Sequence, residues 1–480
     1  RKDYLDDLFN LYGEKFKNLN KLLLIDNQYS LSNQIYFNND LYFEKQEKIR
    51  KFFNPYKSLH AYKDSIYNDY IFLNIANIQS IPIIIKDIYK DGKKINFQSI
   101  NYIMKGRDSP DKKLVYKRIK FNIDTLKVLD PNFKNLTLSY EIFGVDSTRI
   151  EKVNSWSNNL LSKKNFINQI YKPNIKRFNF LSILSTKSKI LFNKKKCIIS
   201  EDLIIPSGFL VEGFKGLEIE FKNNSKIISF SPMIIKGTKN EPIKIFSSGD
   251  DGGGIISIIN ANGLSKLQYI KFYNLSKLNV KDDNFTGIIN CYESDLNIDN
   301  CSFENNNSED FLNIIRSEFI ITNCNFKNIY SDAFDSDFSK GEIKNSSFYN
   351  CGNDAIDISG SSIFAKDIII SKIVDKGISI GEKSNFKGQN IKIFNTNIGI
   401  ANKDLSTAEI DSLDLSKSNV GVACYQKKDE FGPSKLRITE GVLYQNHISF
   451  ACQMNSSLWF NNKEISPVDS SEESLLQFLE

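Results

Sequence analysis

The chain of 480 residues has very few of the side chains on which most enzyme chemistry relies. It contains only two histidines, His60 and His447, and we expect them in different domains. Ser-His-Asp catalysis, Cys-His catalysis and His-rich metal sites are therefore disfavoured. Any chemistry must come from carboxylates, Lys, Arg or Tyr.

Cysteine is present but lacks the spacings that would give it a known role. The seven cysteines form no CxxC pair and no zinc-ligand pattern. Cys301 and Cys324 occupy equivalent positions of the repeat described below. We therefore expect a stack of buried thiols rather than a disulfide framework.

Long apolar runs and basic blocks are also missing. No run of about 18 apolar residues occurs, so we expect no transmembrane segment, and the opening RKDYLDDLF is no signal peptide. The net charge of +6 is spread along the chain, which gives little support for a nucleic-acid partner. Because the first residue is Arg1, we expect a processed protein or part of a longer one.

What the chain does contain is a repeat of constant length. Apolar residues recur every 22 residues (356−334, and so on to 422−400), and they open similar phrases: Phe334, Ile356, Ile378, Ile400 and Val422. The unit consists of short strands and Gly or Asn turns, without helical spacing. This pattern predicts a β-solenoid in which each repeat forms one coil.

Alternation within the repeat predicts which side chains face inward. The residues above form one inward column, and the residues two positions later form a second: Ser336, Ile358, Ile380, Asn402 and Cys424. Between them lies an outward column: Asp335, Asp357, Ser379, Ala401 and Ala423. A second wall is predicted at Ile369, Ile391 and Leu413. The phrases NCSFENN, NCNFKN and NSSFYN mark a corner where Asn tolerates left-handed geometry and can form a ladder.

The fold is thus predicted to be mainly β, with four segments along the chain. We expect a helical or irregular segment over 1–67, an immunoglobulin-like β-sandwich over 68–160, the β-solenoid over 175–468 and an acidic tail over 469–480. Residues 427–436 are expected to lengthen one coil into a loop.

Aspartates gather on the outward side of the coils. Asp335 and Asp357 are predicted on adjacent coils, about 4.8 Å apart along the stack. Asp337 follows on the same strand, and the turn just before carries Asp310, Asp332 and Asp354. Two such carboxylates repel by about 1 kcal/mol in water and by roughly 3–4 kcal/mol in a partly dry groove. A bound cation, a shared proton or cationic neighbours would relieve this repulsion.

Each form of relief implies a different role. A calcium ion would take oxygen ligands from Asp335, Asp337 and Asp357. A carboxylate pair with separated pKa values would suit glycoside hydrolysis. The structural alternative is that Asp332, Asp354 and their neighbours cap turns by accepting backbone N–H bonds.

Several phrases resemble a known superfold. SDAFDSDF, NDAIDIS and DKGISIGEKS, with IPSG and PIKI, resemble right-handed parallel β-helices of the pectate-lyase type over about 180–465. That superfold hosts lyases, hydrolases, epimerases, tailspikes and adhesins. In its lyases a calcium ion acidifies the uronate C5 proton and a Lys or Arg removes it, which implies four candidate bases here: Arg316, Lys340, Lys383 and Lys403.

More loosely, the chain is similar to the C-terminal halves of bacterial surface proteins whose upstream part is a spore-coat-protein-H-like (CotH) kinase. The phrases SEDFLNIIRSEF, SDAFDSDFSKG and YQKKDEFGP carry this similarity. No kinase catalytic segment is visible, so that activity is not carried over.

Together these observations predict a bacterial β-helix protein of the cell surface, periplasm or extracellular space that binds, and cleaves or epimerises, an acidic polysaccharide. The predicted catalytic residues are Asp335, Asp357, Arg316 and Lys403. The predicted substrate-binding residues are Asp332, Asp354, Lys383, Tyr425 and Lys427. The rival hypotheses are a non-catalytic surface or adhesion module and a tailspike-like trimer.

Overall fold

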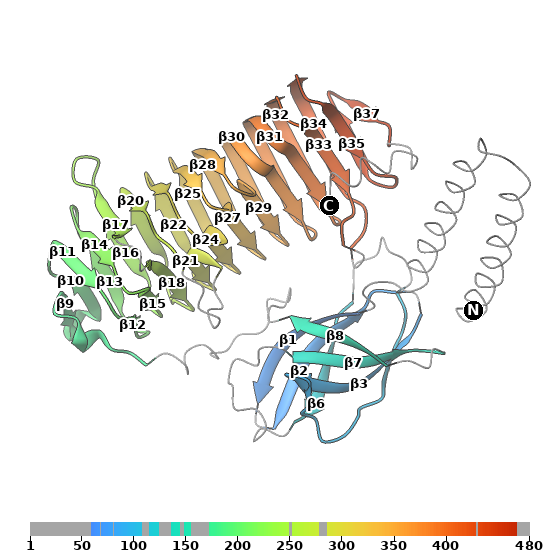
Figure 1. Cartoon of the computed structure of the whole chain (residues 1–480), viewed down its shortest axis with the longest axis horizontal. Helices are drawn as coiled ribbons and strands as arrows, with labels where there is room; N and C mark the ends of the chain where they lie inside the picture. The colour runs from blue at the N-terminus through green and yellow to red at the C-terminus, as the bar shows by residue number, and fades with distance from the viewer. Residues whose placement is uncertain are drawn as a thin grey trace, which may run out of the picture.

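A computed structural model describes most of the chain in two β-rich parts (Figure 1). The described residues are 59–67, 69–79, 81–107, 115–123, 136–144, 148–154, 172–248, 252–277, 286–428 and 431–467. The helical segment predicted over most of 1–67 and the tail predicted over 469–480 lie outside these ranges. No helix in the described residues is long and apolar enough to span a membrane.

The smaller part is one eight-stranded sheet around its own apolar core. The strand order is β4-β3-β7-β8-β1-β2-β6, with β5 paired to β3. The strands are β1 (Leu59–Tyr67), β2 (Tyr70–Asn77), β3 (Ile83–Lys90), β4 (Lys93–Lys94), β5 (Tyr102–Met104), β6 (Lys117–Asn122), β7 (Leu136–Ile142) and β8 (Thr148–Asn154). The expected boundary at residue 67 was wrong, because β1 pairs along its length with β2. Leu59 and Ala61, two residues apart on one face of the strand, belong to the core of this sheet.

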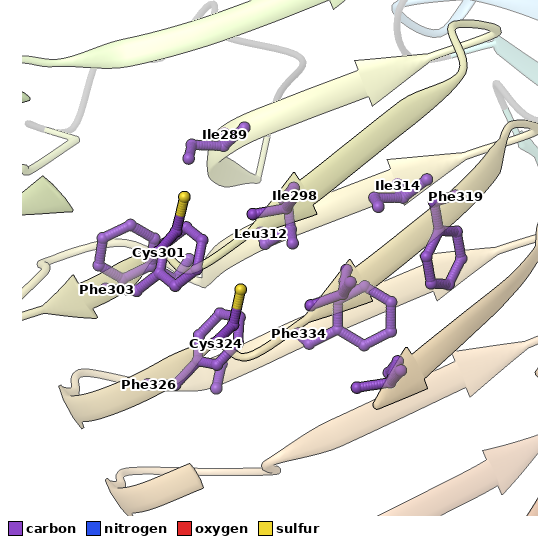
Figure 2. Close-up of a cluster of buried hydrophobic side chains, with 14 of the residues drawn as sticks. Ile289, Ile298, Cys301, Phe303, Leu312, Ile314, Phe319, Cys324, Phe326 and Phe334 are labelled. Carbon is purple, nitrogen blue, oxygen red and sulfur yellow. The ribbon is translucent and has the colours of Figure 1, made fainter. Parts of the chain in front are cut away.

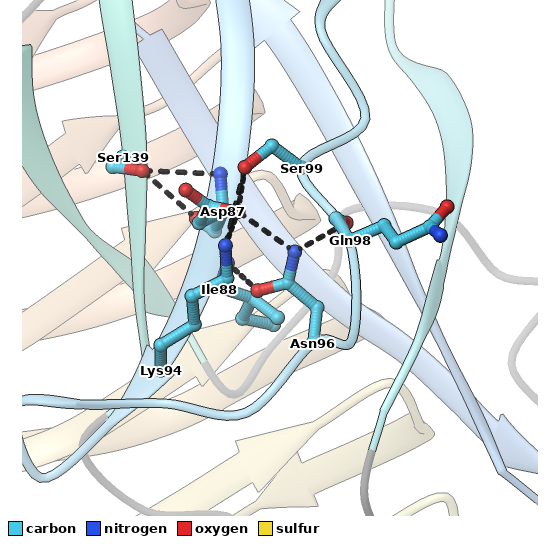
Figure 3. A network of polar contacts seen from close by, with 7 residues as sticks. All are labelled: Asp87, Ile88, Lys94, Asn96, Gln98, Ser99 and Ser139. Carbon is cyan, nitrogen blue, oxygen red and sulfur yellow. Dashed lines mark hydrogen bonds and ion pairs between the residues drawn. The ribbon is translucent and has the colours of Figure 1, made fainter.

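A polar network fixes an irregularity in this sheet (Figure 3). The pairing of β3 with β7 shifts between Ile85 and Ile88, and the Asn96 side chain accepts the N–H of Ile88 there. Asn96 Nδ2 in turn donates to Asp87 Oδ1 at 2.9 Å. Burial alone would raise the pKa of Asp87. Hydrogen bonds from Lys94, Ser99 and Asn96 outweigh this effect and hold the pKa of Asp87 below its ordinary value. The network satisfies polar groups that the shifted pairing would leave without partners.

The larger part is a parallel β-solenoid whose coils stack along one axis (Figure 1). Each coil supplies strands to three parallel sheets, which we call sheets I, II and III in the order that one coil passes through them.

Sheet I contains β12 (Leu203–Ile205), β15 (Lys226–Ser229), β18 (Ile255–Ile259), β21 (Gly287–Tyr292), β24 (Asp310–Ile315), β27 (Asp332–Asp337), β29 (Ile356–Ser359), β33 (Val420–Tyr425) and β35 (Ile448–Cys452). Sheet II contains β10 (Lys189–Phe192), β13 (Leu210–Gly213), β16 (Met233–Lys236), β19 (Ser265–Gln268), β22 (Leu296–Asp299), β25 (Glu318–Thr322) and β36 (Ser457–Phe460). Sheet III contains β11 (Lys196–Ile199), β14 (Glu218–Phe221), β17 (Ile243–Ser247), β20 (Ile270–Tyr273), β23 (Ser302–Glu304) and β26 (Asn325–Ile329).

Long strands turn the corners in the later coils and belong to more than one sheet. They are β28 (Lys340–Cys351), β30 (Ser362–Gly381), β31 (Asn385–Lys403), β32 (Thr407–Ser416) and β34 (Lys435–Tyr444). Their pairings continue sheets II and III, and β30 and β31 also continue sheet I.

The predicted period is confirmed by the strand register. Phe334 pairs with Ile356, Ile356 with Ile378, Ile378 with Ile400 and Ile400 with Val422. The next coil is longer, since Val422 pairs with Phe450 (450−422 gives 28), so the loop predicted at 427–436 lengthens a coil. The parallel β-helix is thus confirmed, and its right-handedness stays a prediction.

One predicted column was wrong by a residue. Ile391 pairs with Leu413 as expected, but its partner on the preceding coil is Ile368 and not Ile369. Ile368 is buried, whereas Ile369 is 47% exposed and belongs to sheet III. The step here is 23 residues (391−368), so counting by 22 selected the wrong neighbour.

Inward columns of Ile, Leu, Phe and Cys fill the space between the sheets (Figure 2). Phe272, Phe303, Phe326 and Phe348 stack along sheet III, with ring centroids 5.2, 4.3 and 4.8 Å apart. All seven cysteines are free and buried, which confirms the prediction of buried thiols, and burial raises the pKa of Cys301 well above its ordinary value. These thiols are therefore packing residues.

The Asn-rich corners also behave as predicted. Asn300, Asn323 and Asn345 have φ values of 53°, 55° and 49°, in the left-handed region. At the next corner Asn350 Nδ2 donates to Asn328 Oδ1 at 2.9 Å, and Asn328 Nδ2 donates to Asn305 Oδ1 at 3.2 Å. Side-chain hydrogen bonds thus continue the coil-to-coil ladder at the corners.

Irregular elements cover the first coil and a hairpin follows the last. The 3₁₀ helix η3 (Ile175–Arg177), strand β9 (Leu181–Leu184) and a second 3₁₀ helix, η4 (Ser185–Lys187), precede β10. Ile175, Phe178 and Phe180 pack into the solenoid core, and β9 pairs antiparallel to β10. At the other end β36 pairs antiparallel with β37 (Lys463–Ile465). These features protect the sheet edges, as a solenoid requires.

Candidate functional site

The outward face of sheet I carries the predicted acids on three consecutive coils. We call this surface the acid face; it consists of Asp310 on β24, Asp332, Asp335 and Asp337 on β27, and Asp354 and Asp357 beside and on β29. Asp310 pairs with Asp332 in the strand register, and Asp335 pairs with Asp357. The sequence prediction that successive coils align these residues is therefore confirmed.

Asp335 and Asp357 form the centre of the acid face. Both side chains are partly exposed. Asp335 Oδ2 accepts a hydrogen bond from Asn313 Nδ2 at 2.8 Å, and the same amide group donates to Asp310 Oδ2 at 3.0 Å. Asp357 Oδ1 is buried and has no hydrogen-bond partner among the described residues. An unsatisfied carboxylate oxygen is costly in a folded protein and marks a place where a ligand can supply the missing donor.

Burial and mutual repulsion keep these carboxyl groups protonated at higher pH than usual. Burial, and next the Asp337 charge, raise the pKa of Asp335 well above its ordinary value. Burial is also the main cause that raises the pKa of Asp310 to about 6, of Asp337 to about 7 and of Asp332 to about 8. The acid face is therefore only partly ionised near neutral pH.

The acids that precede the strands act as backbone caps. Asp332 Oδ1 accepts the N–H of Asp354 at 2.6 Å, and Asp354 Oδ1 accepts the N–H of Lys376 at 2.9 Å. Farther along, the fully buried Asp404 accepts the N–H groups of Lys427 and Lys428 at 2.7 and 2.8 Å. For Asp332 and Asp354 the structural alternative is thus correct. Asp335 and Asp357 have no such bond among the described residues.

Lysines border the acid face on the following coils. Lys376 stands one coil beyond Asp354, and its Nζ lies 3.6 Å from Asp354 Oδ1. Burial alone would lower the pKa of Lys376, but the nearby Asp354 and Asp375 carboxylates outweigh it and raise this pKa above its ordinary value. Burial and the nearby charges of Lys403 and Lys376 lower the pKa of Lys427. The three lysines therefore share one electrostatic environment beside the acids.

Lys403 reaches back over its neighbouring coil toward the acid pair. Its Nζ donates to Ser379 Oγ at 2.8 Å, and Ser379 is the residue that pairs with Asp357 in the next coil. Gly381 makes this path possible, because a Cβ there would lie 3.0 Å from Lys403 Cε. A predicted catalytic residue is thus placed beside Asp357.

Two predicted basic residues are not brought to the acid pair. The Arg316 side chain is 5% exposed, donates to the Tyr292 hydroxyl at 2.9 Å and lies 3.6 Å from Glu293 Oε1. A buried, paired guanidinium cannot act as a base. Lys340 belongs to sheet II, where it pairs with Glu318 and Ser362.

Among the predicted substrate-binding residues, Tyr425 differs from expectation, whereas the roles of Lys383 and Lys427 stay predictions. Tyr425 is 3% exposed and packs with Ile398, Val420 and Ala423, so it cannot offer a ring face to a sugar. Lys383 is partly exposed and lies at a corner, with its backbone N–H bonded to Asp404 O at 2.8 Å. Lys427, in contrast, is exposed at the edge of the loop.

Calcium binding at the acid face stays a prediction. Within the described ranges, no group of three or more His, Cys, Asp or Glu side chains is arranged to hold a metal ion, and this includes Asp335, Asp337 and Asp357. No step of the function proposed below involves calcium.

A surface cavity of about 560 Å³ lies elsewhere, on the outward side of sheet II. Ile320, Phe364 and Lys340 are among the residues that line it. Its charged residues are of both signs, and none belongs to the acid face. We place the chemistry at the acid face, because it combines carboxyl groups of raised pKa with an unsatisfied carboxylate oxygen.

Comparisons with known proteins give no family. No family model matches the chain, and no curated protein matches it. One similar solved structure is a double mutant of the periplasmic alginate epimerase AlgG, with 13% identity over 67% of this chain and 86% of that chain and a TM-score of 0.39. An alginate lyase from Paenibacillus has 11% identity over 51% of this chain and 91% of that chain and a TM-score of 0.28. The catalytic unit of an α-1,3-glucanase from Streptomyces thermodiastaticus has 8% identity over 83% of this chain and 91% of that chain and a TM-score of 0.21.

Likenesses this low establish no shared activity. The resemblance to CotH-type surface proteins finds no support among these matches. The argument for function therefore depends on the residues of the acid face and their neighbours.

Sequence reasoning missed Lys376, Asp404 and Gly381 as parts of this region. The 22-residue period could have predicted that Lys376 lies one coil from Asp354, because the two residues are one period apart (376−354 gives 22). Asp404 required the loop geometry, since its two donors are backbone N–H groups in the lengthened coil.

Proposed function

We propose that the protein binds an acidic polysaccharide across the acid face and processes it by proton transfer at Asp335 and Asp357, outside the cytoplasm. The observation that carries this proposal is that Asp335 and Asp357 stand in register on adjacent coils, with lysines on the coils that follow. Paired carboxyl groups on one face are the usual means of acid–base chemistry on sugars.

The lysines indicate an anionic rather than a neutral glycan. Lys376, Lys403 and Lys427 gather at one end of the acid face, and two of them contribute to lowering the pKa of the third. A uronate carboxylate placed among them would relieve this repulsion. The ammonium groups would also stabilise the negative charge that develops when the C5 proton leaves. We therefore assign Lys403 to substrate binding, although its sequence context predicts a base.

The two carboxyl groups supply the proton transfers. Asp357, which is partly exposed, accepts the C5 proton; Asp335, whose raised pKa favours the protonated form, donates a proton. In cleavage, the C5–H and C4–O4 bonds break, a C4=C5 double bond forms, and the proton from Asp335 reaches the leaving O4. In epimerisation the C4–O4 bond stays intact, and Asp335 gives its proton to C5 on the face opposite to Asp357 instead. Neighbouring strands lie about 4.8 Å apart, so the two residues project from adjacent strands on one face.

Deuterium exchange at C5 tests this proposal independently of the final product. Alginate and polygalacturonate are incubated with the protein in D₂O and examined by NMR for deuterium at C5 and for unsaturated ends. Asp335→Asn and Asp357→Asn are each expected to lower the exchange rate by about 100-fold or more. Asp414→Asn, which changes an exposed carboxylate on β32, serves as the matched control and should behave as wild type.

Binding is measured separately by the retardation of the protein in gels that contain the same polyuronates. Lys403→Met should weaken retardation, whereas Lys387→Met, which changes an exposed lysine of sheet II, should not. A wild-type protein that neither binds nor exchanges either polymer contradicts the proposal. The scaffold hypothesis is then favoured, since caps such as Asp332 and Asp354 already have a structural role.

A further inference from the structure

A column of aromatic residues runs along the outward face of sheet III, away from the acid face. The register places five residues on successive coils: Tyr349, Ser371, Phe394, Ser416 and Tyr444. The three rings are 37%, 38% and 47% exposed, respectively. They occupy every second coil, so they recur at about 9.6 Å, twice the usual strand spacing. We call this set the aromatic strip.

Small residues separate the rings along this column. Ser371 and Ser416 are only 5% and 4% exposed, so larger neighbouring side chains cover them. The Tyr349 ring is contacted by Lys372, whose Nζ is 5.0 Å from the ring centroid. The strip therefore presents partly exposed rings, separated by covered serines, along one sheet.

The surroundings of the strip are apolar with a few polar groups. The neighbouring outward column contains Ile369 and Val442, which are 47% and 60% exposed, and between them the exposed Lys392 and Asp414. The strip thus combines regularly spaced exposed rings with charged groups at the middle of the adjoining column, an arrangement of apolar and polar groups typical of ligand-binding surfaces. Isolated exposed apolar residues would need no explanation, but three rings at one constant interval do.

We propose that the aromatic strip binds the flat face of an extended β-1,4-linked glycan of the cellulose or chitin kind. In such a chain alternate sugars are turned over, so equivalent apolar C–H faces repeat every second unit. That repeat is close to the ring spacing of the strip. Lys392 and Asp414 can then hydrogen-bond to the hydroxyl or amide groups at the edge of the chain. A helical α-linked glycan presents no such row of faces.

This site goes beyond the proposed function and does not depend on it. The strip is on sheet III and the acid face is on sheet I, so a glycan at one leaves the other free. The strip would hold the protein on an insoluble polymer while the acid face acts on an acidic chain.

Pull-down assays on microcrystalline cellulose, on chitin and on starch granules test the strip. The full chain should bind cellulose or chitin and not starch. Phe394→Ala should weaken binding by about tenfold or more, the effect of losing roughly 1.4 kcal/mol. Phe394→Tyr should retain it. Tyr330→Ala removes a ring that is 65% exposed but outside the strip, and it should bind as wild type.

A double change tests the spacing itself. Phe394→Ser with Ser416→Phe keeps the composition but moves the central ring by one coil, and it should bind as weakly as Phe394→Ala. Wild-type binding by this variant overturns the proposal, as does a wild-type chain that binds none of the three polymers. Concentration-dependent self-association that Phe394→Ala abolishes, without glycan binding, would identify a protein contact instead and also overturns it. Asp335→Asn should leave cellulose or chitin binding unchanged, so the two proposals fail separately.

Discussion

One outward column of sheet I carries carboxylates in two coils and alanines in two others. Asp335 and Asp357 occupy the same register positions as Ala401 and Ala423. The alanines are fully buried in a small apolar cluster with Ile398 and Val420, whereas the aspartates remain partly exposed. The backbone is the same in both places. Coil geometry therefore fixes where a side chain points. The residue type at that position then decides whether it carries an ionisable group or only packs against its neighbours.

The largest effect is expected when a carboxylate is placed in the apolar coils, which tests whether these positions tolerate a charge. Ala423→Asp should lower the free energy of unfolding by about 3–5 kcal/mol, because Ala423 is 0% exposed and no cation partner is built for it. Urea unfolding measures the change. Ala423→Ser, of similar size but uncharged, serves as the control and should cost much less. Equal losses would show that volume and not charge separates the two regions.

The pH dependence of stability examines the carboxylates as they are. The ordinary pKa of Asp is 3.8, and in the folded chain it rises to about 6 at Asp310 and about 7 at Asp337 and Asp354. The stabilising contribution of these protonated groups is complete below about pH 3.8 and is lost as pH rises through 6 to 8. We expect the chain to be about 2–3 kcal/mol more stable at pH 5 than at pH 8, because one carboxyl with a folded pKa of about 7 keeps its proton over the roughly two pH units from 5 to 7, in which the unfolded chain is ionised. Melting curves that move the other way contradict these pKa directions.

Capping acids should respond differently from the acid pair. Asp404→Ala removes the acceptor of two backbone N–H groups in a buried loop and should destabilise the chain by about 1–3 kcal/mol. Asp404→Asn keeps a carbonyl oxygen and should be close to neutral. Chemical denaturation at pH 7 measures both variants. If alanine and asparagine behave alike, the side chain is not acting as a cap.

The smallest expected effect is a gain in the stability of the folded chain. Asp335→Asn removes one charge from the acid face and should stabilise the chain by about 1 kcal/mol at pH 8. The gain should be smaller at pH 5 than at pH 8, because the raised pKa of Asp335 increasingly favours its uncharged form as the pH falls. Unfolding at both pH values provides the measurement, with Asp414→Asn as the exposed control. A loss at pH 8 would mean that Asp335 is a structural acceptor for Asn313 rather than a source of repulsion.

Much of the solenoid was predictable from the chain alone. A constant step of 22 residues is sufficient to align Phe334 with Ile356 and Asp335 with Asp357, because every coil of a solenoid repeats the preceding one. The same arithmetic failed at Ile369, where one extra residue in the coil moved the pairing to Ile368. A slip of one residue exchanges the inside and the outside of a strand, so a single insertion is enough to defeat the count.

The sequence by itself determined the repeat, the inward columns and the alignment of the aspartates, since these depend on spacing and alternation. Only the tertiary structure decided which acids cap backbone amides, that Lys403 passes over Gly381, and that Tyr425 and Arg316 are buried. These features depend on contacts across coils and around the lengthened loop. Burial and electrostatic environment are properties of such contacts, and no periodicity along the chain encodes them.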